Sequence, residues 1–182
     1  MRSLSSLLTS AAAAVALTAQ AAPPAHVEIA YEVFNEGSRV AEVTDRYEHA
    51  GGRYRITETW KGRGIYSLAG EIVRSSRGAV TPAGPRPHEF TDERSRRPPT
   101  RATFDWDARV LTTYRKGETQ ARALPEDAQD RLSFLLALAF AAPASGRTAF
   151  SVTDGGGVSR YVYESVGRER VKLPAGEFEA LK

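Results

Sequence analysis

Apolar and polar residues alternate with a period of two along the first half of the chain. The first such run contains Val27, Ile29, Tyr31 and Val33. This alternation is typical of a β-strand with one face toward solvent. Comparable runs follow over 40–47 and 54–60, and a fourth passes through Tyr66, Leu68 and Ile72. Glycine-bearing turns separate the runs at intervals of about ten residues, so the pattern predicts a meander of antiparallel hairpins.

Prolines interrupt this pattern over residues 82–101. We interpret the stretch as a long connection or an irregular sheet edge, because proline cannot donate a backbone hydrogen bond within a sheet. The alternation resumes over 102–106 and near 111–114. Further strands are expected over 148–152, 159–166 and 177–181.

Residues 125–142 are the exception and predict a helix. Pro125 suits the first helical position, and Glu126 and Asp127 suit the positive end of a helix dipole. From residue 132 onward, Ser133 is the only residue of this stretch that is not apolar. A helix that is apolar on every side has to be surrounded on every side, and its roughly 16 Å is too short to cross a membrane. We therefore predict a mainly β fold with one buried α-helix, in which a curved antiparallel sheet or an unclosed β-barrel wraps around the helix.

The N-terminus has the features of a secretory signal peptide. It combines the positive charge of Arg2, a short alanine-rich apolar core and the small-x-small cleavage pattern Ala19-Gln20-Ala21. The apolar core is too short to span a bilayer. We expect residues 1–21 to be the signal peptide, with cleavage near Ala21 and Ala22, and residues 22–182 to form one soluble exported domain.

Composition narrows the classes of function. The chain is 41% hydrophobic and 26% charged, as ordinary globular proteins are. It contains no cysteine, which excludes a cysteine nucleophile and cysteine-ligated zinc or iron–sulfur centres. The net charge of +3 is too small to indicate a nucleic-acid partner.

Four motifs resemble those of a known family. They are Gly84-Pro85-Arg86-Pro87 followed by Phe90, Phe104-Asp105-Trp106, Gln129-Asp130-Arg131-Leu132-Ser133, and Leu173-Pro174-Ala175-Gly176-Glu177-Phe178. In their order and spacing the chain resembles the exported proteins grouped as domain of unknown function 3108, over nearly its whole mature length. The Gln-Asp-Arg-Leu-Ser element is the most specific of the four.

The resemblance implies a Gram-negative periplasmic protein with an unclosed antiparallel barrel, like that of periplasmic lipoprotein carriers. Members of the family continue past the Pro-Ala-Gly element by several tens of residues with further strands, whereas this chain stops at Lys182. We therefore expect either a fragment that lacks its last strands or an unpaired last sheet edge.

Two carboxylates at the predicted helix start allow two interpretations. Asp127 and Asp130 lie three positions apart and share a helix face, so they could form a pair for acid–base chemistry. We favour compensation of the helix dipole, with an ion pair between Asp130 and Arg131 that fixes the helix entrance. On this interpretation the structural motif consists of Gln129, Asp130, Arg131 and Ser133.

The remaining polar motifs do not indicate an enzyme. The histidines are His26, His49 and His88, and their spacing is not that of metal ligands. No serine-hydrolase motif is present. The glycines of 153–157 lead into a strand, so we expect a hairpin loop and not a phosphate site. We expect no catalytic residue, no metal and no cofactor.

Two charged features remain. Glu58 shares a strand face with aromatic residues, and we expect it near the barrel mouth; an arginine partner or a ligand-orienting role is the alternative. Trp60 and Trp106 are expected to pack in the core or at its rim. The second feature is a basic group consisting of Arg94, Arg96, Arg97 and Arg101. It could contact anionic headgroups, although we favour a solvated loop.

These features favour a non-enzymatic binding or carrier module for a lipid, a lipoprotein acyl chain or another hydrophobic ligand. The expected cavity lining consists of Tyr54, Ile56, Trp60, Leu132, Leu135, Leu136, Ala139 and Phe140. The alternative is a structural module of the cell envelope that docks an envelope protein by adding a strand to its sheet. An enzyme is the least favoured of the three hypotheses.

Overall fold

A computed structural model describes residues 25–140 and 146–182 of the chain. The predicted signal peptide and its cleavage site lie outside the described residues, as does the side chain of Phe140.

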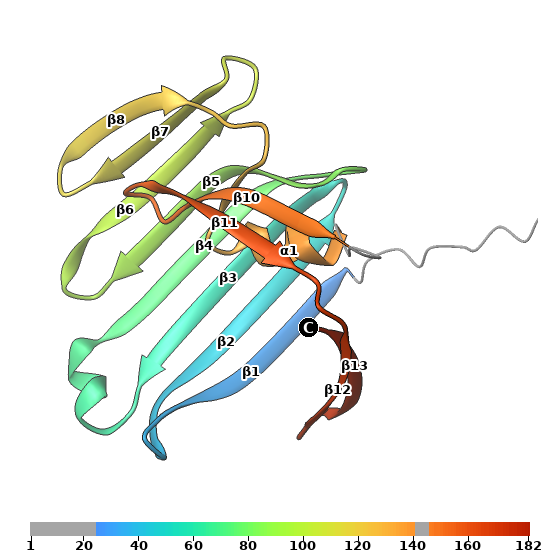
Figure 1. The fold of residues 1–182 in the computed structure, drawn as a ribbon. Helices are drawn as coiled ribbons and strands as arrows, with labels where there is room; N and C mark the ends of the chain where they lie inside the picture. Colours follow the sequence, from blue (N-terminus) through green and yellow to red (C-terminus); the bar gives the residue numbers. More distant parts are fainter. Residues whose placement is uncertain (1–24, 141–145) are drawn as a thin grey trace, which may run out of the picture.

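The main element is an eight-stranded antiparallel sheet in which each strand pairs with its neighbours in sequence (Figure 1). Its strands are β1 (His26–Asn35), β2 (Ser38–Ala50), β3 (Arg53–Gly62), β4 (Glu71–Thr81), β5 (Gly84–Arg94), β6 (Arg97–Asp105), β7 (Val110–Arg115) and β8 (Glu118–Ala123). Residues that alternate along each strand point to opposite faces. One face carries the buried side chains of the sheet, such as Val43, Phe90 and Leu111, and we call it the inner face.

A second layer covers part of the inner face. It contains β9 (Ala128–Asp130), the helix α1 (Ser133–Phe140), β10 (Arg147–Thr153) and β11 (Val158–Glu164). Strand β10 pairs parallel with β9 and antiparallel with β11. Figure 1 shows α1 and this small sheet in front of the large sheet, and α1 contacts β5. A separate hairpin, β12 (Arg168–Leu173) and β13 (Gly176–Leu181), ends the chain.

The core lies between the two layers and has two parts. The larger cluster contains Phe90, Ala102, Phe104, Leu111, Leu124, Ala128 and Leu132. The smaller cluster joins α1 to β10 through Ala137, Phe150 and Val152. Apolar burial between the layers therefore fixes the position of β9 and α1 against the sheet.

The predicted fold class is confirmed. The chain is mainly β, and the antiparallel sheets of the described residues are open, without a closed barrel. In the same part of the chain, no helix has both the length and the apolar character that crossing a bilayer requires.

The expectation of a connection or irregular edge over 82–101 is wrong, because these residues form β5 and β6 inside the large sheet. Pro85 and Pro87 lie in β5 before its pairing with β6 begins. Their carbonyl oxygens accept hydrogen bonds from the side chains of Gln129 and Trp106. The nitrogen and carbonyl of a strand residue point to the same edge, so each missing N–H faces a side without a neighbouring strand.

The prolines of β6 also lie where the pairing of the strands is interrupted. Pro98 and Pro99 have no partner in the register with β5, and the pairing of β6 with β7 begins only at Arg101. Local gaps in pairing therefore let these prolines lie inside a sheet.

The helix is shorter and more exposed than the sequence predicts. Residues 128–130 form β9 because they pair with β10, so α1 begins only at Ser133. The side chain of Leu135 is 56% exposed, and Ala139 is also exposed. The large sheet contacts α1 on one side and β10 with β11 on another, which leaves a third side open to solvent.

Two further strand predictions differ from the structure. Tyr66 and Leu68 are exposed in a short 3-10 helix, η1 (Gly64–Ala69), and β4 starts only at Glu71. The sequence analysis missed β8 and β12, whose side chains are mostly exposed and therefore show no apolar alternation.

Candidate functional site

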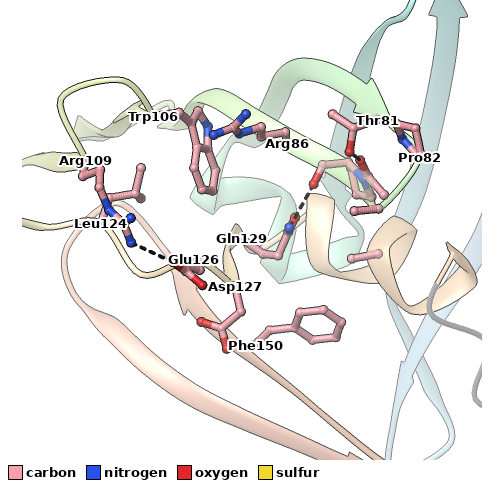
Figure 2. A pocket seen from close by; sticks show the side chains of 14 residues that line it. Thr81, Pro82, Arg86, Trp106, Arg109, Leu124, Glu126, Asp127, Gln129 and Phe150 are labelled. Atoms are coloured by element: carbon pink, nitrogen blue, oxygen red, sulfur yellow. Dashed lines mark hydrogen bonds and ion pairs between the residues drawn. The ribbon is translucent and has the colours of Figure 1, made fainter.

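A pocket of about 660 Å³ opens between the two layers (Figure 2). Its walls come from the turn between β4 and β5, the end of β6, the segment before β9, α1 and β10. The apolar part of the lining consists of Pro82, Ala83, Pro85, Leu124, Ala137 and Phe150. This volume and this mixture of apolar walls with a few polar groups are typical of small-molecule sites.

Gln129 supplies the most informative polar group in the pocket. Its side chain is 7% exposed. Its Nε2 donates a hydrogen bond to the carbonyl oxygen of Pro85 at 3.0 Å, which fixes the amide. Its Oε1 is buried and accepts no hydrogen bond from the described residues. A buried acceptor without a partner costs about 1–3 kcal/mol.

Trp106 and Arg86 form one wall of the pocket. Trp106 Nε1 donates to the carbonyl oxygen of Pro87 at 2.7 Å, which fixes the indole. The guanidinium of Arg86 lies 4.5 Å from the centroid of the indole ring, within the range of a cation–π interaction. Arg86 is exposed, and no carboxylate of the described chain lies within ion-pair distance of it.

The acidic residues at the rim are already engaged. Glu126 accepts from Arg109 at 3.0 Å, and Asp127 accepts from Arg160. The lining therefore combines apolar residues with Gln129 and with Arg86, an exposed cation that has no ion-pair partner among the described residues.

Asp130, which follows Gln129, is fully buried and closes the start of α1. Its Oδ1 accepts the backbone N–H groups of Leu132 at 2.8 Å and Ser133 at 2.9 Å, and its Oδ2 accepts the hydroxyl of Ser76 at 2.6 Å. The Ser133 hydroxyl accepts the N–H of Asp130 at 2.8 Å, which completes a reciprocal helix cap. Burial raises the pKa of Asp130, and burial with the Asp130 charge raises that of Tyr54, whose hydroxyl lies 3.1 Å from Ser76 Oγ.

The expected ion pair between Asp130 and Arg131 does not form. The Arg131 side chain is exposed, and within the described ranges its backbone N–H donates to Thr153 while Ser76 contacts Asp130. Asp127 engages Arg160 instead. The two carboxylates thus have different partners, and their geometry is that of a helix cap and a surface ion pair.

A chain of ion pairs crosses the inner face beside this cap. Arg74 donates to Glu58, and its Nε donates to Asp92 at 3.0 Å. Arg94 donates twice to Asp92, each time at 2.9 Å. Burial acts to raise the pKa of Asp92, but the hydrogen bonds from Arg94 and Arg74 outweigh it and lower that pKa. The expectation of Glu58 at an open mouth is wrong, since Glu58 is buried and paired with an arginine.

Further polar atoms on the inner face lack partners. Asp45 Oδ1, the Tyr47 hydroxyl and Trp60 Nε1 are buried and make no hydrogen bond with the described residues. Burial and the facing charge of Glu58 raise the pKa of Asp45. Burial and the Asp45 and Glu58 charges raise the pKa of Tyr31 to about 12. This part of the inner face therefore combines apolar and aromatic side chains with buried charged and hydroxyl groups, whereas the sequence predicts an apolar lining.

Comparison with known families covers nearly the whole described chain. The model of the family "Protein of unknown function (DUF3108)" matches residues 27–182. The chain belongs to the DUF3108 family. No curated protein and no solved structure matches it.

In this DUF3108 protein the predicted cavity-lining residues are dispersed. Tyr54 and Leu132 are buried in the interior, and Ile56 packs against the larger core cluster. Leu135 and Ala139 face solvent, and Leu136 is half-buried. None of these residues lines the pocket of Figure 2, to which α1 contributes Ala137.

The four predicted basic residues of this DUF3108 protein do not share one surface. Arg94 is held by Asp92, and Arg96 is exposed in the turn between β5 and β6. Arg97 lines a pocket together with Arg94, whereas Arg101 lines a different one. Sequence reasoning could not assemble either pocket, because residues far apart in the chain form each of them.

Proposed function

We propose that this protein is a non-enzymatic binding or carrier module for a lipid or another hydrophobic ligand, and that the pocket between β5, β9 and α1 holds the ligand. The observation that carries the proposal is a largely apolar pocket of about 660 Å³ that is lined by Gln129, a residue whose buried Oε1 has no partner in the described residues. The proposed ligand has an apolar chain and, next to it, an N–H or O–H group that donates to this oxygen.

The energetics of burial support an alkyl chain as the apolar part. Each methylene that leaves water contributes about 0.8 kcal/mol, which is roughly a fourfold gain in affinity. A chain of eight methylenes contributes about 6 kcal/mol, enough to offset much of the cost of association. The signal peptide predicted over residues 1–21 adds export to the periplasm to this proposal, and there the module would meet envelope lipids.

The first test is native mass spectrometry of protein purified after export, followed by organic extraction. We expect a co-purified lipid or similar apolar molecule. The second test is titration with N-octanoyl-, N-decanoyl- and N-dodecanoylglycine, which carry an amide N–H beside the chain. Affinity should rise about 15-fold for each two added methylenes.

A pair of matched variants locates the site. Ala83 is exposed at the turn between β4 and β5 and lines the pocket, whereas Ala108 is exposed between β6 and β7 and does not. Ala83→Trp should reduce acylglycine affinity at least tenfold, and Ala108→Trp should leave it within twofold. Protein that carries no ligand and shows no dependence on chain length would refute the carrier function.

An interaction module of the cell envelope is the second candidate, and the edge strand β1 supports it. Among the strands of the described residues, β1 pairs with β2 alone, so one row of its backbone groups could pair with a partner strand. Ile29 is 55% exposed and Phe34 is 58% exposed on this strand. Crosslinking in intact cells from a photoreactive residue at position 29 should give one reproducible protein adduct if this function is correct.

A further inference from the structure

A second pocket, of about 370 Å³, lies at the opposite end of β5 from the proposed lipid site. Residues of β5 and β6 on either side of their connecting turn line it, together with residues at the turns between β7 and β8 and between β10 and β11. At about 3.3 Å per residue, the length of β5 from Arg86 to Arg94 separates the two pockets by roughly 26 Å. Figure 1 shows these turns at the side of the sheet away from α1.

Cations dominate the walls of this pocket. They are Arg94, Arg97, Arg115 and Lys116, and the acidic lining residues are Asp92 and Asp154. Within the described part of the chain, Arg97, Arg115 and Lys116 have no carboxylate within ion-pair distance. Three cations are therefore available to a ligand.

Both carboxylates of the pocket are already occupied. Asp92 accepts hydrogen bonds from Arg74 and Arg94. Asp154 Oδ1 accepts the backbone N–H groups of Gly156 at 2.9 Å and Gly157 at 3.2 Å. These contacts leave both negative charges in place, and four cations against two carboxylates give the lining a net charge of +2.

The glycine loop between β10 and β11 is shaped around one of these cations. A Cβ atom on Gly156 would lie 2.5 Å from Cδ and Nη1 of Arg115. Gly155 has a φ of +86°, and a Cβ there would lie 3.0 Å from Thr100 Oγ1. The positive φ of Gly155 favours glycine at that position. The loop backbone lies close to the Arg115 side chain, and its own amides are hydrogen-bonded within the loop.

We propose that this pocket binds a phosphate-bearing anion through Arg97, Arg115 and Lys116. Guanidinium groups match the geometry of phosphate oxygens and bind them in pairs of parallel hydrogen bonds, and lysine adds a point charge. The same chemistry fits a free phosphate compound and the phosphodiester headgroup of an anionic phospholipid. The site is independent of the proposed lipid pocket, since it shares no lining residue with it.

The test compares two double variants of the full chain that remove the same charge. Arg115→Gln/Lys116→Gln alters the pocket, and Arg53→Gln/Arg55→Gln alters exposed arginines on β3, which have no ion-pair partner in the described residues. Binding of inorganic pyrophosphate is measured by calorimetry. Binding to phosphatidylcholine vesicles with and without 30% phosphatidylglycerol is measured by sedimentation. Circular dichroism confirms that each variant is folded.

We expect the pocket variant to lose at least tenfold in anion affinity and the control variant to stay within twofold. Loss of pyrophosphate binding identifies a site for free phosphate compounds, and loss of vesicle binding alone identifies a phospholipid headgroup. Absence of saturable binding to both probes, or equal losses in the two double variants, overturns the proposal. Acylglycine binding should be unchanged in the pocket variant, so failure here is separable from failure of the carrier function.

Discussion

Asp130 connects the large sheet to the helix through a single buried carboxylate. It accepts a hydroxyl from Ser76 on β4 and two backbone N–H groups at the start of α1. Asp130→Ala removes the helix cap and leaves the buried Ser76 hydroxyl without this acceptor. Since a cap contributes about 0.5–2 kcal/mol and an unsatisfied buried group costs about 1–3 kcal/mol, we expect the free energy of unfolding to fall by about 2–4 kcal/mol.

Urea denaturation measures this change, and Asp127→Ala is the matched control. Asp127 forms a surface ion pair with Arg160, and such pairs contribute about 0–1 kcal/mol. Equal destabilisation by the two variants would contradict the cap assigned to Asp130.

Asp45 makes the free energy of unfolding depend on pH. Burial and the Glu58 charge raise its pKa in the folded state, so the folded protein binds a proton more tightly than the unfolded chain does. Stability from this group is complete below the unfolded pKa of about 3.9 and is lost as the pH rises through the folded value. Asp45→Asn should therefore remove part of the decrease in stability above pH 4.

Carbon-13 titration of the Asp45 carboxyl group checks the cause. Glu58→Gln should lower the pKa of Asp45, because it removes the neighbouring negative charge. The assignment fails if Asp45 titrates at or below pH 3.9 in the unmodified protein.

One side of α1 is open to solvent, and an exposed leucine on that side can be compared with a buried leucine in the turn before the helix. Leu132, in the turn that leads into α1, is 5% exposed in the larger core cluster, whereas Leu135 is 56% exposed. Leu132→Ala should lower the free energy of unfolding by about 2–5 kcal/mol, and Leu135→Ala should change it by less than about 0.5 kcal/mol. Thermal or urea unfolding of both variants measures the difference. A large effect of Leu135→Ala would mean that the outer side of α1 is covered.

The sequence predicts a strand correctly where the signal lies within the residues of the strand itself. Period-two alternation identifies β1 to β3 and β7 because one face of each strand carries apolar residues. It fails for β5, where prolines are accommodated by a local gap in pairing and by the Gln129 and Trp106 side chains. The alternation does not identify β9 either, because this strand consists of only three residues and forms by pairing with β10.

Candidate sites are harder to predict than strands because they join distant segments. Gln129 belongs to the most specific family motif, yet its role depends on Pro85, 44 positions away. The sequence does not indicate a role for Arg115, because its contact with the glycine loop at 155–157 forms only in the folded protein. For both residues, the sequence gives the residue type but does not show which distant residue it contacts.

At the scale of the whole molecule, two pockets of different chemistry lie at the two ends of β5. The apolar pocket lies at its start and the basic pocket at its end, with the buried pairs of Arg74 on the inner face beside it. Breaking a buried pair by removing one partner costs about 3–5 kcal/mol, so this middle section resists rearrangement. Each pocket should therefore bind its ligand without altering the other.

The terminal hairpin should be the least stable part of the described fold. Strands β12 and β13 pair only with each other and contain no buried side chain. Two-stranded hairpins are marginally stable in water without further packing, whereas β4 is flanked by strands on both sides and carries the buried Arg74 and Ser76. In hydrogen exchange followed by mass spectrometry, amides of 168–181 should exchange at least about 100-fold faster than those of 72–80. Addition of an acylglycine should not protect the hairpin, because none of its residues lines the apolar pocket at the start of β5. Protection equal to that of β4 would show that the hairpin packs against a surface, and a partner strand would then be the first explanation to examine.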